Sequence, residues 1–220
     1  MTAAHPVIDW STLPERMKTL PFDPQRKIPV PWFVAWIDGV PEFRTADGRK
    51  WRRAIDRRLC WVCGQRLGVH LVFVLGPMCT ITRTTSEPAC HRDCARWSAI
   101  NCPFLARPHM HRREANLPAQ AIDAPGYAIK RNPGVSALWL TSSFELFPDG
   151  AGRQLIEVGP AREVEWYAEG RLATRAEVEE SMRTGLPFLV EQARSQHGAM
   201  EELEKQCRAA QMWLPAESAA

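Results

Sequence analysis

The sequence has no apolar run long enough to cross a membrane. Its two most apolar windows, Ile28–Val40 and Val69–Met78, are short and interrupted, whereas a transmembrane helix needs about 20 apolar residues. Residues Met1–Lys27 also lack an apolar core behind basic residues, which a secretory signal requires. We therefore expect a cytoplasmic protein with no membrane partner.

Several signatures of catalysis are also missing. No glycine-rich loop of the phosphate-binding kind occurs, and Ser142-Ser143 lacks the glycine pattern of a nucleophile elbow. Zinc deaminases pair a His-x-Glu segment with Pro-Cys-x-x-Cys. This chain has no His-x-Glu, and Pro88–Cys94 is one residue too long. We expect no small-molecule cofactor, and the absences favour a protein that is not an enzyme.

The cysteines are the strongest positive signal. In a chain without a secretory signal, clustered cysteines indicate a metal more often than a disulfide. They form a split set, Cys60-Trp-Val-Cys63-Gly64 and Cys90-His91-Arg-Asp-Cys94. Zinc is bound tetrahedrally by Cys and His, usually in two such pairs. The spacing therefore predicts a closed, structural zinc site.

The sequence leaves part of the ligand set open. The preferred ligands are Cys60, Cys63, His91 and Cys94, because a two-residue gap suits the first turn of a helix. Cys90 could replace His91, since positions four apart share a helix face. Cys79 is a further alternative, and Cys102 lies two helical turns after Cys94. The competing interpretation is a set of buried thiols without metal.

The first half of the chain predicts a small metal-binding module. Residues 1–31 contain six prolines and predict an extended arm. Periodicity and turn signals then predict the following elements: a strand at 32–37, a turn at Asp38-Gly39, a return strand at 40–44, a helix at 49–59, a strand at 69–75, an extended piece at 79–82, a loop at 84–88, and a helix from His91 to before Pro103. A cysteine turn, a hairpin and a ligand-bearing helix are the order of a treble-clef-like module, which we assign to residues 32–105.

The second half predicts a sheet followed by helices. Residues 106–126, which include His109 and His111, are a predicted linker. Strand signals follow at 127–130, 137–144, 154–158 and 163–167. Thr174 with Glu177 is a capping box, and it begins a helix that should end near Thr184 with Gly185 as its left-handed cap. A second helix should run from Leu186-Pro187 to about Met212.

The predicted fold class is therefore α+β. A treble-clef-like zinc module is joined to an antiparallel meander sheet with two C-terminal helices, and residues 127–220 should pack as one unit with that module.

Charge is unevenly distributed along the chain. Eight basic residues lie between Arg44 and Gly68 against two Asp, whereas ten Glu lie between Glu163 and Glu204 against four Arg. A basic face beside a zinc site suggests nucleic-acid binding. The candidate contact residues are Arg49, Arg52, Arg53, Arg57 and Arg58. Alternatively, the two halves attract each other or are simply solvated.

Several segments together resemble a group of uncharacterised phage and bacterial proteins with a Cys-x-x-Cys…Cys-His-x-x-Cys zinc-binding motif. The segments are Phe33–Trp36 with Asp38-Gly39, Cys60–Gly64, Gly76–Cys79, Pro88–Cys94 with Cys102–Leu105, and Glu169–Arg171 leading into Thr174–Glu177. The resemblance implies metal binding and a phage or prophage origin, hence the host cytoplasm, but no activity.

These observations lead to one main functional hypothesis and one alternative. The main hypothesis is a zinc-stabilised, non-enzymatic binding protein of a phage or prophage that engages nucleic acid or a host protein through its basic face. The alternative is a metal-dependent nuclease or hydrolase of the treble-clef, His-Asn-His-like type. It would require an open coordination position, with His91 or His109 near the metal.

Overall fold

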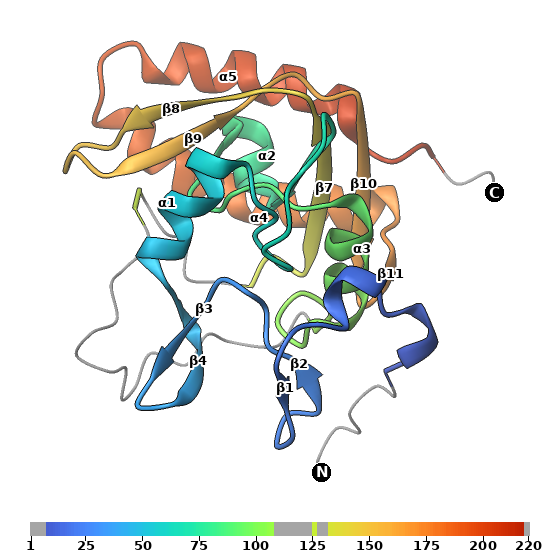
Figure 1. Ribbon diagram of the computed structural model, residues 1–220. Coiled ribbons are helices and arrows are strands. Elements are labelled where there is room, and N and C mark those ends of the chain that lie inside the picture. Colours follow the sequence, from blue (N-terminus) through green and yellow to red (C-terminus); the bar gives the residue numbers. More distant parts are fainter. Residues whose placement is uncertain (1–7, 108–124, 127–131, 218–220) are drawn as a thin grey trace.

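The computed structural model describes residues 8–107, 125–126 and 132–217, and shows a mixed α and β structure whose sheets are antiparallel (Figure 1). Its helices are α1 (Gly48–Arg57), α2 (Pro77–Thr82), α3 (Arg92–Asn101), α4 (Arg175–Arg194) and α5 (Ala199–Ala210). Its strands are β1 (Phe22–Asp23), β2 (Ile28–Pro29), β3 (Val34–Ile37), β4 (Val40–Ala46), β5 (Leu71–Leu75), β6 (Thr84–Thr85), β7 (Val135–Thr141), β8 (Phe144–Pro148), β9 (Gln154–Val158), β10 (Glu163–Ala168) and β11 (Arg171–Leu172). Within these residues, no helix has the length and apolar character needed to cross a bilayer.

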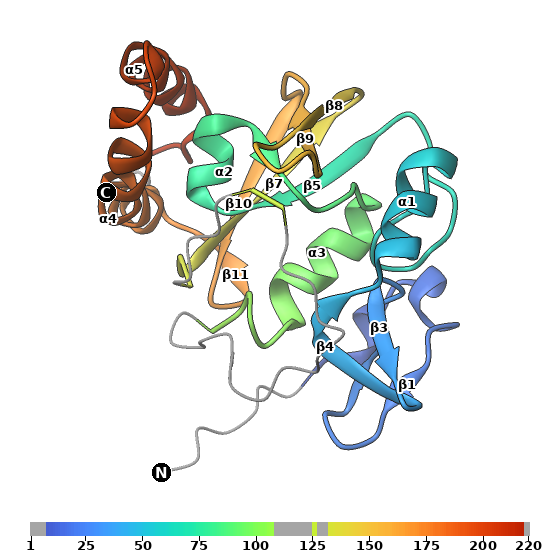
Figure 2. The same ribbon diagram turned by 90° about the vertical axis from the view of Figure 1, so that its left-hand side faces the viewer.

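A four-stranded sheet in the order β11-β10-β7-β5 forms the centre of the molecule. Helix α3 covers one face, and α2 and α4 cover the other, with α5 packed on that pair (Figure 2). Strand β7 is buried at six of its seven positions, because helices exclude water from both of its faces. Trp139 and Phe73, side by side on β7 and β5, are among its largest fully buried side chains.

Strands from the two halves of the chain share sheets. β5 pairs with β7, and β6 pairs with β9. The predicted meander is wrong in one respect, because β8 and β9 form a separate sheet with β6. The predicted strand 137–144 breaks at Ser142-Ser143, where the Thr141 hydroxyl accepts the Ser143 N–H at 3.4 Å. This side-chain bond closes a bend that turns the chain out of the central sheet.

The predicted hairpin and first helix are confirmed. Asp38 and Gly39 both have positive φ, at 49° and 75°, as a two-residue turn between twisted strands requires. β3 and β4 then pair antiparallel, with Ile37 opposite Val40. The Asp47 carboxylate caps α1 by accepting the Arg49 N–H at 2.8 Å.

Residues 8–31 of the predicted arm contain short elements. Two single 3₁₀ turns, Trp10–Thr12 and Glu15–Met17, precede the β1–β2 hairpin. Met17 and Val30 are 2% and 1% exposed, so this segment packs tightly on the rest of the chain. The predicted strand 127–130, like His109 and His111, lies outside the described residues.

The extended piece predicted at Cys79–Thr82 is wrong, because these residues belong to α2. Pro77 occupies its first turn, where a missing N–H costs nothing. The Thr80 and Thr82 hydroxyls donate to the carbonyls four residues earlier, so both hydroxyls are satisfied within the helix. The loop predicted at Thr84–Pro88 begins instead with strand β6.

The predicted division between the two C-terminal helices is also wrong. α4 continues through Gly185 and Pro187, and the break comes at Gly198, whose φ is +74°. Gly185 is buried inside α4, and Pro187 leaves the Arg183 carbonyl without its N–H donor four residues on. Packing of the buried face of α4, which includes Val178 and Met182, outweighs these local costs.

The capping box at the start of α4 is confirmed. The Thr174 hydroxyl accepts the Glu177 N–H at 3.3 Å, and Glu177 accepts the Thr174 N–H at 2.8 Å. We predict that Thr174→Ala lowers the free energy of unfolding by about 1 kcal/mol, because a backbone N–H at the helix start loses its acceptor. Urea denaturation measures this. Thr19→Ala, at an exposed position outside any helix, is the control and should cost less than about 0.5 kcal/mol; equal costs would contradict the capping role.

Candidate metal centre

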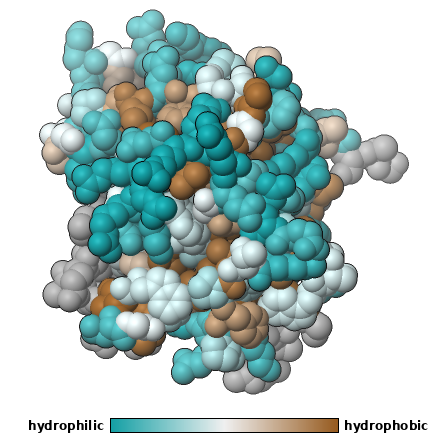
Figure 3. Space-filling model, in the orientation of Figure 1, coloured by the Kyte–Doolittle hydropathy of each residue, from teal (hydrophilic) through white to brown (hydrophobic). Residues whose placement is uncertain are grey.

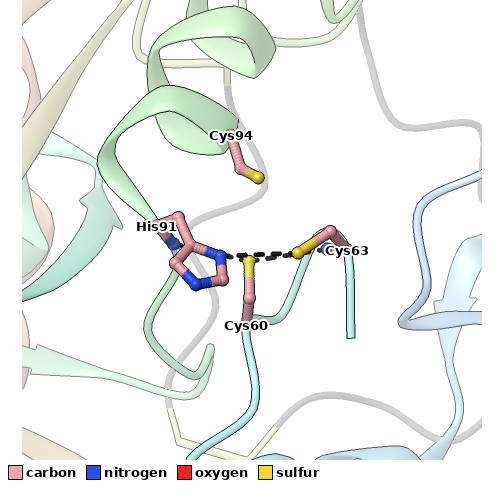
Figure 4. Close-up of side chains that lie close together, drawn as sticks. All are labelled: Cys60, Cys63, His91 and Cys94. Atoms are coloured by element: carbon pink, nitrogen blue, oxygen red, sulfur yellow. Dashed lines mark hydrogen bonds between the residues drawn. The ribbon is translucent and has the colours of Figure 1, made fainter. Parts of the chain in front are cut away.

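Four side chains from two separate segments meet at one point. Cys60 and Cys63 lie in the loop after α1, His91 is the N-cap of α3, and Cys94 is in the first turn of that helix. Their ligand atoms all lie within 4.8 Å of one another, and the side chains converge from the two segments (Figure 4). All three cysteines are buried, Cys60 and Cys94 completely.

The loop that carries the first cysteine pair is a tight turn. The Cys60 N–H donates to the Gln65 carbonyl at 2.7 Å, and the Gly64 N–H donates to the Cys60 carbonyl at 2.8 Å. Gly64 has a φ of +73°, and a Cβ there would lie 2.6 Å from Cγ of Trp32. Glycine is therefore required for both backbone conformation and space.

Backbone N–H groups from both segments surround the Cys60 sulfur. The Cys63 N–H donates to Cys60 Sγ at 3.5 Å, and the His91 N–H donates to the same sulfur at 3.4 Å. Donors of this kind stabilise the thiolate form, which is the form that binds metal.

The His91 ring is held with one nitrogen facing the thiols. Nε2 lies 3.1 Å from the Arg66 carbonyl, and Nδ1 lies 3.4 Å from Cys63 Sγ. Because a carbonyl oxygen only accepts, Nε2 carries a proton in this contact. In the neutral form of the ring, which is the form that binds metal, the lone pair is then on Nδ1. A backbone carbonyl that orients a metal-binding histidine in this way is a common outer-shell partner.

The protonation states of the four groups depend strongly on one another. Burial acts to raise the pKa of Cys60, but hydrogen bonds from Cys63, Cys90, Cys94 and His91 lower it below its ordinary value. Hydrogen bonds to Cys60 and Cys63 raise the pKa of Cys94. Burial acts to lower the pKa of His91, yet hydrogen bonds to Cys60 and Cys63 raise it to about 10. One thiolate is thus stabilised at the expense of the others, and a cation would allow all three to ionise together.

The donor set suits a metal ion. Three thiolate sulfurs and one imidazole nitrogen are compatible with zinc. Four donors match the tetrahedral coordination of a structural zinc ion. Within the described part of the chain, no second group of three or more His, Cys, Asp or Glu ligand atoms comes together.

The alternative ligands lie outside this group of four. The Cys90 N–H donates to the Val72 carbonyl at 2.7 Å, and the Val72 N–H donates to the Cys90 carbonyl at 3.0 Å. The buried thiol of Cys90 lies beside Cys60. Cys79 is in α2, where burial raises the pKa of its thiol to about 11. Cys102 is the C-cap of α3, and burial likewise raises its pKa.

The five candidate arginines gather on α1 rather than at the metal cluster. Arg49, Arg52, Arg53 and Arg57 are exposed on the helix, and exposed Arg58 ends it in the left-handed conformation, with φ at 51°. α1 leads directly into the loop that carries Cys60 and Cys63, here called the metal loop. The Leu59 N–H donates to the Ala54 carbonyl, and the Leu67 N–H donates to the Arg58 carbonyl. The basic helix is thus joined to the candidate metal centre.

An ion-pair network that sequence reasoning missed anchors the start of α3. Arg92 and Arg96 both donate to Glu165 of β10, through Nε atoms at 2.9 and 2.8 Å. Arg92 also pairs with Glu163, and Asp93 pairs with Arg16 at 3.0 Å. The available signals were the alternation of Glu163 and Glu165 on one strand face and the four-residue spacing of the two arginines.

Glu165 is the centre of that network. Burial acts to raise the pKa of its carboxyl, but hydrogen bonds from Arg96, Arg92 and Tyr167 lower it to about 2. The network therefore ties the ligand-bearing end of α3 to the central sheet.

The chain matches no protein-family model, no curated protein and no solved structure. The phage or prophage origin inferred from the sequence resemblance stays a prediction.

We predict that the four converging side chains, and not Cys90, are needed to hold metal. Cys94→Ala should abolish stoichiometric metal, because it removes one of four donors, whereas Cys90→Ala should keep one metal per chain. Elemental analysis of protein purified without chelator measures this. Cys94 belongs to both ligand sets, so loss of the metal in Cys90→Ala would show that Cys90 replaces His91 as the fourth ligand.

We predict a pH-dependent contribution from Glu165. Because its pKa is lowered from 4.5 to about 2, its stabilisation is present in full above pH 4.5 and is lost as the pH falls towards 2. Glu165→Gln should cost on the order of 2 kcal/mol at pH 7 and at pH 5.5. The difference from the unmodified protein should shrink below pH 4.5.

Thermal unfolding of both proteins at pH 7.0, 5.5, 4.0 and 3.0 measures the difference. Glu145→Gln, at an exposed position on β8, is the matched control and should change little at any pH. A Glu165→Gln effect that stays constant down to pH 3 would contradict the prediction.

Proposed function

We propose that this chain is a zinc-stabilised, non-enzymatic protein that binds nucleic acid through the exposed arginines of α1. The observation that carries the proposal is a row of arginines on a helix that is joined by its backbone to the metal loop. In this proposal zinc orders the loop, and the loop positions the helix.

The donor chemistry supports zinc in a structural role. Thiolates with one imidazole are typical zinc ligands, and four protein donors leave no position for a reactive water. The binding energy of such an ion is folding energy, because the unfolded chain does not hold the four ligands together. The alternative nuclease or hydrolase would need an open position, which this donor set does not favour.

The arrangement around the ligands supports a treble-clef-like module as its architecture. A cysteine turn supplies one pair of ligands and the first turn of a helix supplies the other. The intervening chain contains β5, α2 and β6, so the module would carry a helix where a plain treble clef has only a hairpin.

The arginine spacing supports a single contact face. Arg49, Arg52, Arg53 and Arg57 lie at positions i, i+3, i+4 and i+8, which fall on one side of a helix. Trp51, Ala54 and Ile55 occupy the inner side and pack on the core. Hydrophilic side chains cover α1 in the space-filling view (Figure 3).

The arginines of α1 differ from those of α3 in the ion pairs that they make. Among the described residues, Arg52, Arg53 and Arg57 make no ion pair, and Arg49 approaches Asp47 only at 3.6 Å. Arg92, by contrast, pairs with Glu163 and Glu165, and Arg96 pairs with Glu165. Arg52, Arg53 and Arg57 therefore keep their charge for a phosphate backbone.

The test is binding of a fluorescein-labelled 20-nucleotide strand and of its duplex, followed by fluorescence anisotropy. We expect affinity for at least one of them to fall steeply between 50 and 200 mM salt, as counterion release requires. The double change Arg52→Glu with Arg53→Glu should weaken binding at least about tenfold, because two phosphate contacts become repulsive. Lys205→Glu with Arg208→Glu makes the same charge change on exposed α5 and should leave affinity nearly unchanged.

Salt-insensitive binding, or equal losses in the two double variants, would contradict the proposal. Absence of binding to either nucleic acid would direct attention to a host protein as the partner of the basic face.

A further inference from the structure

We infer that the nucleic acid bound at this site is single-stranded, and that Trp36 is a stacking platform for one of its bases. The inference rests on the proposed function and adds the class of nucleic acid to it. The observation behind it is a set of aromatic rings beside the arginines of α1.

Two tryptophans of the described residues are exposed, Trp10 and Trp36, and the ring of Trp10 packs against those of Phe22 and Trp97. Trp36 lies in β3 and is 45% exposed, and it is not among the side chains packed against the core. Tryptophan is ordinarily well buried, so an exposed ring is informative. Among the described residues, Trp36 makes no ring–ring or cation–ring contact of the kind made by its neighbours, which leaves a face for a ligand.

Two other rings of this region, Trp32 and Phe43, are already paired with cations. The Arg53 guanidinium lies 5.6 Å from the ring centroid of Trp32, and Lys50 Nζ lies 6.0 Å from it. The Arg26 guanidinium lies 4.8 Å from the ring centroid of Phe43. Trp36 is opposite Pro41 in the β3–β4 ladder.

The base of the β3–β4 hairpin contacts the start of α1. Lys50 of α1 donates to the Val34 carbonyl at 2.9 Å, and the Asp47 N–H donates to the Phe33 carbonyl at 2.9 Å. Trp36 is two residues further along the strand, or about 7 Å. In both ribbon views the β3–β4 hairpin adjoins α1 (Figures 1 and 2).

The combination of exposed arginines with an exposed aromatic ring favours single-stranded nucleic acid over a duplex. Proteins that bind single-stranded nucleic acid pair a basic surface that follows the phosphates with aromatic side chains on which bases stack. In a duplex the bases are already stacked on one another, and an exposed ring beside the phosphate contacts gains nothing. Charge complementarity to phosphate comes from the unpaired arginines of α1, and the bare ring of Trp36 provides the stacking surface.

The experiment compares a labelled 20-nucleotide strand with its duplex, by fluorescence anisotropy, on zinc-loaded full-length protein. We expect the single strand to bind more tightly. Trp36→Ala should weaken single-strand binding about tenfold and leave duplex binding nearly unchanged, since one stacked base is lost. Trp36→Phe should recover most of the affinity, because it restores a ring.

Val40→Ala is the matched control, because it shortens an exposed apolar side chain of the same hairpin. It should leave both affinities unchanged, and circular dichroism with metal content checks that every variant is folded. Duplex binding as tight as single-strand binding, or no effect of Trp36→Ala, would overturn this inference and leave the proposed function intact. Binding of neither probe would overturn both.

Discussion

Three thiols and an imidazole around one point form the constraint on which this region of the protein depends. Their ligand atoms lie within 4.8 Å of one another, and the cysteines are buried. Three thiolates at such distances repel one another strongly in a medium of low dielectric constant. A cation among them would remove that repulsion, so metal binding would stabilise this region of the protein.

The cluster connects elements that are distant in the sequence. Cys60 follows α1, whereas His91 and Cys94 begin α3, a helix that packs on the central sheet. Glu165 of that sheet holds the same helix through Arg92 and Arg96. α1 is held by the packing of its inner side on the core and by the loop that carries Cys60 and Cys63. α3 is held by its apolar packing and its ion pairs.

The arginines of the chain serve two different purposes for this reason. Those on α3 face acidic side chains of β10 and contribute to the folded state. Those on α1 project from a helix whose inner face alone packs on the core. The proposed binding of single-stranded nucleic acid depends on this second set, on the exposed ring of Trp36, and on the metal loop that holds both in place.

Features that depend on neighbouring residues were readable from the sequence. The Asp38-Gly39 turn, helix α1, the capping box at Thr174 and the convergence of Cys60, Cys63, His91 and Cys94 all follow from side-chain chemistry within a few residues or from familiar ligand spacing. The continuity of α4 through Gly185 and Pro187, the helix at Pro77–Thr82 and the transfer of β8 and β9 to a second sheet did not. Each depends on contacts with segments far away in the chain, whose packing energy exceeds the local preference. The sequence by itself thus determined which residues could bind a metal and where many elements begin. The tertiary structure decided that Cys90 stays outside the group of four, that Glu165 anchors α3, and that Arg52, Arg53 and Arg57 make no ion pair with any described residue. These outcomes depend on distances between segments that no local pattern specifies.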